Sequence, residues 1–456
     1  MKPLVFGEPG AFRDEMVRQI LAGEKTGSSN LRVVYEMWGE QLPQVGELYA
    51  LLDSTDSPAA VIRITEVVHT TSPEVTPELA AHESPSVEHW RDVHREFWLS
   101  LVPSIRQFLG DPEWELTDDE PVVSKVFELV RPVGVIGAGF HATTNILPAS
   151  VLAGLELGGL ATRDVERSRA ALLKFGSLGT PFASADELLA DDAVKDVVIV
   201  AQPADQATLT RQAIAAGRNV FVDKPLGWTS AEAKEIADEA EAAGTVVMVG
   251  FMKRYAPVYL QLKQLIESGD LGTVRSFHVF FGCDSTPFCA TEEDYLKLAS
   301  IHMVDLVRFL FGEAADVHTL SRTEGSHVAL AVTLRFASGV VGTMELLGTP
   351  AYSSETEVVR VSGDRAHVTV TDVARLTLHE APVSGTATWR TPADRTETFA
   401  PSESAMSGVQ RDLFLRGFVG ELEAFAAAAA SGVAPTSSAA DNVATMELCE
   451  RILAHA

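Results

Sequence analysis

A glycine-rich turn stands directly behind a short apolar strand pattern near residue 137. The turn reads G-A-G-F-H-A, with Gly137, Gly139 and Ala142 at its small positions, and a helical pattern follows it. In a βαβ unit the first glycine makes the turn, the second admits a pyrophosphate, and the third small residue lets helix and strand pack closely. The order therefore predicts a dinucleotide-binding fold. Phe140 and His141 belong to the same turn, and we assign them to the cofactor site as well.

The segments after this turn alternate between strand and helix patterns, which is typical of a doubly wound parallel sheet. The short strands expected are Val133–Ile136, Leu155–Ala161, Asp196–Ala201, Asn219–Val222 and Val246–Gly250. Beyond residue 256 we expect longer strands at Val274–Gly282, His327–Phe336, Val340–Leu347 and Glu357–Thr371, and closing helices at Leu413–Ala430 and Ala439–Ala456. The sequence thus predicts a multidomain α/β chain. Its domains are 1–130, a Rossmann domain at 131–255, and a substrate and oligomerisation domain at 256–456.

Composition excludes several classes of protein. The 63 acidic and 36 basic side chains give a formal charge of −27, which repels phosphate backbones and argues against nucleic-acid binding. The three cysteines are too few for a disulfide framework and lack metal-ligand spacing, so we expect buried thiols and no metal. Residues 1–10 lack the apolar core of a secretory signal, and we expect a cytoplasmic protein without a membrane span.

The end of the second strand bears on cofactor choice. An acidic residue there would bind the ribose of NAD, but this chain has Thr162 and Arg163 instead. A hydroxyl and a guanidinium suit a 2′-phosphate, so NADP(H) is favoured over NAD(H). The alternative is that Arg163 is a solvated loop residue and Asp164 takes the ribose of NAD.

Asp223, Lys224 and Pro225 follow the fourth strand, at the sheet edge where open α/β sheets bind their ligands. A lysine there can hold the nicotinamide ribose and stabilise a developing anion. Gln202 follows the third strand at the same edge. We assign Gln202, Asp223, Lys224 and Pro225 to the cofactor site, with Lys224 also catalytic.

Residues 131–456 resemble the Gfo/Idh/MocA oxidoreductase family. The resemblance rests on the glycine-rich turn, on Asp223-Lys224-Pro225 in place of the usual Glu-Lys-Pro, on Gly250–Tyr255, and on Ile301–Asp305 before Phe311-Gly312. It implies a C-terminal α+β domain with a large, open, mostly antiparallel sheet, a small-molecule substrate, and a homodimer or homotetramer.

The chain departs from this family at the proton-transfer site. Family members place an Asp four residues before the catalytic His302, and here that position is Leu298. An imidazole without an orienting carboxylate is a poorer acid or base. Tyr295 is the alternative proton donor. The remaining residues of the motif, expected as substrate contacts, are Arg254, Tyr255 and Asp305.

Residues 1–130 resemble the ASCH domain, a small β-barrel related to the PUA domain. The matching segments are Gly23–Thr26, Leu42–Glu47, Val61–Glu66, Glu74–Thr76, and Trp90–His94 followed by Phe97. Some ASCH proteins are amidohydrolases of acylated cytidines that use a Lys, a Ser or Thr, and a Glu. The resemblance maps these roles to Lys25, Ser28 and Glu66, although a ligand-binding or structural module is also implied.

Together these features predict an NADP(H)-dependent oxidoreductase that transfers hydride to a carbonyl or imine carbon of a small polar substrate. An accessory ASCH module precedes it. Two alternatives stay open: a catalytically degenerate NADP(H)-binding protein, and a bifunctional enzyme whose ASCH domain acts as a nucleoside-type amidohydrolase.

Overall fold

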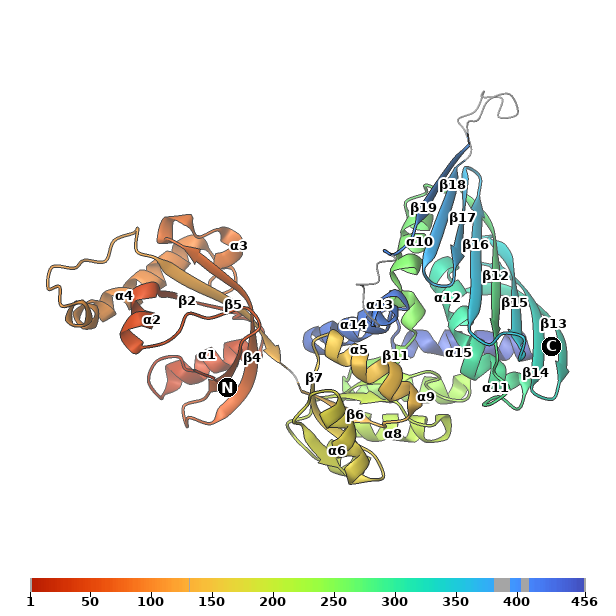
Figure 1. The fold of residues 1–456 in the computed structure, drawn as a ribbon, viewed down its shortest axis with the longest axis horizontal. Helices are drawn as coiled ribbons and strands as arrows, with labels where there is room; N and C mark the ends of the chain where they lie inside the picture. The colour runs from red at the N-terminus through yellow and green to blue at the C-terminus, as the bar shows by residue number, and fades with distance from the viewer. Residues whose placement is uncertain (1, 131, 381–393, 403–409, 455–456) are drawn as a thin grey trace. The chain divides into compact units, whose positions relative to one another are not determined.

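The computed structural model of the chain describes residues 2–130, 132–380, 394–402 and 410–454 (Figure 1). The chain divides into two compact units, Met1–Arg131 and Pro132–Ala456. The further division of the second unit near residue 255 stays a prediction. Among the described residues, no helix combines the length and the apolar character that a membrane crossing requires.

The first unit contains a five-stranded sheet in the order β1-β3-β4-β5-β2. Its first pair, β1 with β3, is parallel, and its other pairs are antiparallel. The strands are β1 (Lys2–Leu4), β2 (Gly27–Leu31), β3 (Leu48–Leu52), β4 (Pro58–Thr70) and β5 (Val122–Val130). The helices are α1 (Ala11–Leu21), α2 (Arg32–Trp38), η1 (Ser72–Glu74), α3 (Pro77–Ala80) and α4 (Val87–Leu109). The expected barrel is thus supported as far as this five-stranded sheet.

The second unit begins with a six-stranded parallel sheet in the order β11-β10-β9-β6-β7-β8. The strands are β6 (Pro132–Ile136), β7 (Glu156–Ala161), β8 (Thr180–Phe182), β9 (Asp196–Ile199), β10 (Asn219–Asp223) and β11 (Val247–Gly250). The helices are η2 (Ala142–Ile146), α5 (Leu147–Leu152), α6 (Val165–Lys174), α7 (Ala185–Leu189), α8 (Pro203–Ala215) and α9 (Ser230–Ala243). The strand order reverses between β6 and β9, and such a switch point opens a ligand crevice. The predicted doubly wound sheet is confirmed. Only the three-residue β8, too short to show a pattern, was not expected.

An eight-stranded sheet follows, in the order β13-β14-β15-β12-β16-β17-β18-β19, and only its β12–β15 pair is parallel (Figure 1). The strands are β12 (Val274–Cys283), β13 (Ala314–Glu324), β14 (His327–Phe336), β15 (Val341–Gly348), β16 (Thr356–Gly363), β17 (Ala366–Thr371), β18 (Arg375–Glu380) and β19 (Arg395–Phe399). Buried and exposed residues alternate along β14 and β15, so one face of the sheet carries the core. This confirms the large, mostly antiparallel sheet.

Helices of the second half connect and cover these sheets. They are η3 (Met252–Tyr255), α10 (Pro257–Glu267), α11 (Glu292–Asp294), η4 (Tyr295–Ser300), α12 (Ile301–Phe311), α13 (Arg411–Leu415), α14 (Phe418–Ser431) and α15 (Ala439–Ala454). The last expected helix extends to residues 455–456, which lie outside the described residues.

Two expected elements are each divided in the structure. The single strand expected over Glu357–Thr371 is the hairpin of β16 and β17, because the chain reverses after Gly363. The helix expected over Leu413–Ala430 is broken at Gly417, whose φ is +91°. A Cβ at Gly417 would lie 2.0 Å from the carbonyl oxygen of Met252, so the chain approaches η3 too closely there for any larger residue.

Candidate functional site

The glycine-rich turn joins β6 to η2 at the switch point of the parallel sheet. Gly137 has a φ of +108°, and a Cβ there would lie 2.0 Å from the carbonyl oxygen of Val200. Gly139 is different, because a Cβ there would meet no atom within 4 Å. The first glycine is therefore required by the fold, and the second leaves open space above the turn. Ala142 is fully buried, as close packing of strand and helix requires.

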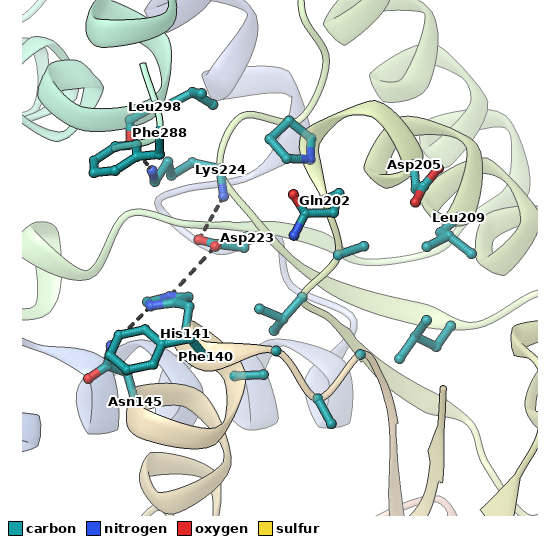
Figure 2. Close-up of a pocket in the computed structure, with 18 of the residues that line it drawn as sticks. Phe140, His141, Asn145, Gln202, Asp205, Leu209, Asp223, Lys224, Phe288 and Leu298 are labelled. Carbon is teal, nitrogen blue, oxygen red and sulfur yellow. Dashed lines mark hydrogen bonds and ion pairs between the residues drawn. The ribbon is translucent and has the colours of Figure 1, made fainter. Parts of the chain in front are cut away.

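A cavity of about 1200 Å³ opens above this turn. It lies between the carboxyl ends of the parallel strands and the segments that follow β12 and precede β16 in the eight-stranded sheet. Figure 2 shows part of its lining. The sequence-predicted residues that line it are Gly137, Gly139, Phe140, His141, Ala142, Thr162, Arg163, Gln202, Asp223, Lys224 and His302. The structure therefore gathers most of the predicted cofactor and catalytic residues around one space.

At one end of the cavity the loop after β7 carries Thr162 and Arg163. Asp164 begins α6, where its side chain accepts a hydrogen bond from the Glu166 amide at 3.0 Å. A carboxylate used as a helix cap has fewer free lone pairs for a ribose. Arg167, which the sequence reasoning missed, donates to the carbonyl oxygen of Ala138 in the glycine-rich turn at 2.6 Å and also lines the cavity. Arg163 precedes the helix that carries Arg167, so helical spacing gave no signal for it.

Lys224 follows β10 and points into the cavity (Figure 2). Its Nζ donates a hydrogen bond to the backbone carbonyl of Leu298, and its amide donates to Asp223 Oδ1 at 2.9 Å. The backbone oxygen of Leu298 thus contacts the lysine at the position where the resembling family has an aspartate. A carbonyl carries no full negative charge, so the positive charge of Lys224 stays available to a ligand.

His302 lies near the start of α12 and lines the same cavity. Its Nδ1 is buried without a hydrogen-bond partner among the described residues, as the missing aspartate predicts. Burial, together with the charges of Lys224 and Lys253, holds the pKa of His302 well below its usual value. The imidazole is therefore neutral at neutral pH.

His141 forms a chain of polar contacts in front of the glycine-rich turn (Figure 2). Its Nδ1 lies 3.0 Å from the side-chain amide of Asn145, and its Nε2 lies 3.6 Å from Asp223 Oδ2. The ring also packs edge-to-face on Phe418. These contacts fix the imidazole beside Asp223.

Several predicted residues lie away from the cavity lining. Tyr295 is fully buried, and its hydroxyl has no hydrogen-bond partner among the described residues. Arg254 and Asp305 are also buried, and they pair with each other through two hydrogen bonds of 2.7 and 2.6 Å. The Tyr255 hydroxyl contacts Thr436 and Ser437. The structure thus places these four residues outside the cavity lining, with Tyr295, Arg254 and Asp305 buried and Tyr255 partly buried.

The eight-stranded half contributes lining residues that the sequence reasoning missed. Asp284 and Phe288 follow β12, and Glu355 forms an ion pair with Arg416 across the opening. The segments around Asp284, Glu355 and Arg416 are far apart in sequence and show no local motif, so the sequence offered no signal for them.

The ASCH constellation differs from the expected one. Glu66 is exposed on β4, whereas Lys25 Nζ lies 3.1 Å from the buried carboxylate of Glu83. Ser29, not Ser28, donates to Glu83 through its hydroxyl and its amide. Burial opposes ionisation, but the contacts with His94, Lys25 and Ser29 hold the pKa of Glu83 below its usual value. The chain after β4 thus brings Glu83, and not Glu66, to Lys25, and the catalytic role expected of the ASCH residues stays a prediction.

Three family models match successive parts of the chain. Residues 2–131 match the ASCH domain, residues 131–251 match the GFO/IDH/MocA oxidoreductase family with its NAD-binding Rossmann fold, and residues 259–372 match the GFO/IDH/MocA C-terminal domain.

Individual proteins agree with this match. Inositol 2-dehydrogenase from Acidothermus cellulolyticus is 30% identical over 265 residues, which cover 51% of this chain and 76% of that protein. D-apiose dehydrogenase from Paraburkholderia graminis is 27% identical over 353 residues, covering 73% of this chain and 90% of that protein. The structure of levoglucosan dehydrogenase in complex with NADH superposes with a TM-score of 0.61 at 20% identity, covering 71% of this chain and 96% of that one. At this identity it shows a shared fold.

Proposed function

Because the chain belongs to the GFO/IDH/MocA family of NAD(P)-dependent oxidoreductases, with an ASCH domain ahead of it, we propose that it is a reductase that uses NADPH. Its substrate would be a small polar, sugar-like compound with a carbonyl or imine carbon that accepts the hydride. The observation that carries the proposal is the single cavity shared by the glycine-rich turn, Lys224 and His302.

The chain's own residues fit a dinucleotide. The open space above Gly139 admits a pyrophosphate, and the carboxyl ends of β6 and β9 flank it. The nicotinamide supplies the hydride when the cofactor is bound. The remaining work of binding, orientation and charge stabilisation falls to the residues of this cavity.

The preference for NADP(H) is supported by two guanidinium groups. Arg163 and Arg167 both line the cavity, as does Asp164, whose Oδ1 accepts the hydrogen bond that caps α6. A 2′-phosphate takes charge-assisted hydrogen bonds from arginine, which a ribose hydroxyl does not match. The solved structure of levoglucosan dehydrogenase, 20% identical to this chain, holds NADH, so the proposed preference for NADP(H) rests on Arg163 and Arg167 alone.

We expect Arg163→Ala to weaken the binding of NADPH by about 1.5 to 3 kcal/mol, the usual range for hydrogen bonds to a charged group. The binding of NADH should stay nearly unchanged. Calorimetric titration with both cofactors measures this. Arg169→Ala is the matched control, because Arg169 lies on α6, is exposed and is absent from the cavity lining. Equal affinity of the Arg163 variant and the wild type for NADPH would reject the phosphate role.

Lys224 would stabilise the negative charge that develops on the substrate as hydride arrives. His302 is neutral at neutral pH and so is a poor proton donor. With a carbonyl substrate the alkoxide would take its proton from Lys224, whereas an iminium would need no proton and would leave Lys224 without a developing anion to stabilise.

The substrate class is supported by the relatives. Inositol, apiose and levoglucosan are all polyhydroxylated carbon skeletons, and the proteins named for them share this family. A screen of keto-sugars, keto-inositols and cyclic imines with NADPH, followed by absorbance at the nicotinamide band, tests the proposal. Oxidation of NADPH with any of them supports it.

A second candidate is a degenerate protein that binds NADP(H) without turnover. Leu298 and the unpaired Nδ1 of His302 favour it. Tight NADPH binding with no turnover across the whole screen would support this candidate over the reductase.

A further inference from the structure

The first 130 residues contain three lysines, and the ammonium of each lies over an aromatic ring. Lys2 and Lys125 lie 5.7 and 5.4 Å from the ring centre of Tyr49. Lys125 also lies 5.9 Å from the ring of Tyr35, and Lys25 lies 5.8 Å from that of Phe6. We call these three lysines the lysine cluster. Lys2 and Lys25 are close enough to Lys125 that their charges help to lower its pKa. The segment has 10 basic and 23 acidic side chains, so lysines that lie near one another are unexpected there.

Two of the three lysines have a carboxylate partner, and each partner also accepts hydrogen bonds from other groups. Lys2 pairs with Glu47, which also accepts from the Gln44 amide and the Tyr49 hydroxyl.

The partner of Lys25 is Glu83, which also accepts hydrogen bonds from Ser29 and Trp90. His94 stands 3.5 Å from it. Neither carboxylate forms a hydrogen bond or an ion pair with Lys125.

Lys125 is the unpaired member. It is 7% exposed, and its ammonium makes no hydrogen bond or ion pair with any described residue. Burial lowers its pKa to about 8, and Glu40 and Glu83 oppose this only through longer-range attraction. A buried ammonium without a counter-charge is costly, so the site favours whatever anion can reach it.

Hydroxyl groups beside Lys125 are also free. Ser28 is its direct antiparallel partner, so the two side chains lie on the same face of the sheet. The hydroxyls of Ser28 and Tyr35 make no side-chain hydrogen bond with the described residues. One ammonium and two hydroxyl donors without an acceptor make a suitable set for an oxyanion.

We propose that the lysine cluster binds the phosphate or carboxylate group of a small-molecule ligand, with Lys125 as its main contact. The site belongs to the first unit and is independent of hydride transfer. A single compact anion would balance the one positive charge that the two carboxylates leave, and the 23 acidic side chains of the segment disfavour polyanions.

The test is a titration of the full chain with inorganic phosphate and, separately, with acetate, at pH 7 and constant ionic strength in chloride. Because the cofactor cavity also attracts phosphate, the result is the difference between wild type and Lys125→Met, with NADPH saturating in both. We expect the variant to bind at least tenfold more weakly and Lys125→Arg to retain binding. Lys174→Met is the matched control, because Lys174 also lies over a ring, that of Phe175, but is exposed in the second unit.

The two anions identify the ligand group. Binding of phosphate alone indicates a phosphorylated ligand, and binding of acetate indicates a carboxylate. Equal binding by the wild type and a folded Lys125→Met variant overturns the proposal. If circular dichroism shows that this variant is unfolded, Ser28→Ala and Tyr35→Phe decide instead. Each should weaken binding severalfold, and unchanged binding in both overturns the proposal.

Discussion

The ammonium of Lys224 is held by the Leu298 carbonyl, so its position in the cavity is fixed before a ligand binds. Because its charge matters most where an anion develops, we expect Lys224→Met to lower turnover by about 10² to 10³ while changing the dissociation constant of NADPH by less than about fivefold. Steady-state kinetics and a cofactor titration measure the two effects. Lys195→Met, an exposed lysine outside the cavity lining, serves as control. Matching losses in affinity and turnover would make Lys224 a ribose anchor instead.

A second prediction concerns His302, whose pKa lies well below its usual value because of burial and neighbouring cations. The neutral imidazole has little proton to donate near neutral pH. His302→Asn should therefore cost at most about tenfold in turnover, against the roughly 10² to 10⁴ that a true general acid contributes. The pH profile should show no limb near the usual value for histidine, in wild type and variant alike. A thousandfold loss, with an acidic limb abolished by the substitution, would restore His302 as the acid.

The turn between β6 and η2 shows how two glycines of one motif serve different ends. Gly137→Ala would drive a methyl group into the Val200 carbonyl and strain a left-handed backbone, so we expect a loss of about 1 to 3 kcal/mol in stability along with cofactor binding. Gly139→Ala should leave the unfolding free energy nearly unchanged and weaken only the binding of the cofactor. Chemical denaturation and NADPH titration of both variants separate the effects. Similar stability losses in both would contradict this division of roles.

The same turn explains what the sequence could reveal. A strand, a turn and a helix adjacent in the chain leave a local pattern, so the residues around Gly137 and the lysine after β10 were predictable. Glu83 reaches Lys25 only because the chain folds back after β4, and the sequence reasoning chose Glu66 instead. Glu355 and Arg416 meet across 61 positions. Such contacts depend on packing between distant elements, which periodicity does not encode.

The division into two compact units predicts that they respond separately to ligands. NADPH at 100 times its dissociation constant should stabilise the second unit by about 2.7 kcal/mol and leave the first unchanged. Hydrogen exchange followed by mass spectrometry resolves the two, because peptides of β3 and β4 report on one unit and peptides of β6 and β9 on the other. Equal protection of both by NADPH would show that the units unfold together.

Strand β5 is the last strand of the first unit in the chain but lies inside its sheet, between β4 and β2. During synthesis β2 is made early and then has no ladder until residues 122–130 have left the ribosome. The hydrophobic residues around β2 also stay incompletely buried until β5 is available. Because one residue separates β5 from β6, the second unit emerges from the ribosome directly after the strand that completes the first sheet. A nascent chain stalled just short of residue 122 would therefore be recognised as unfolded by chaperones and proteases, although most of the unit has been made.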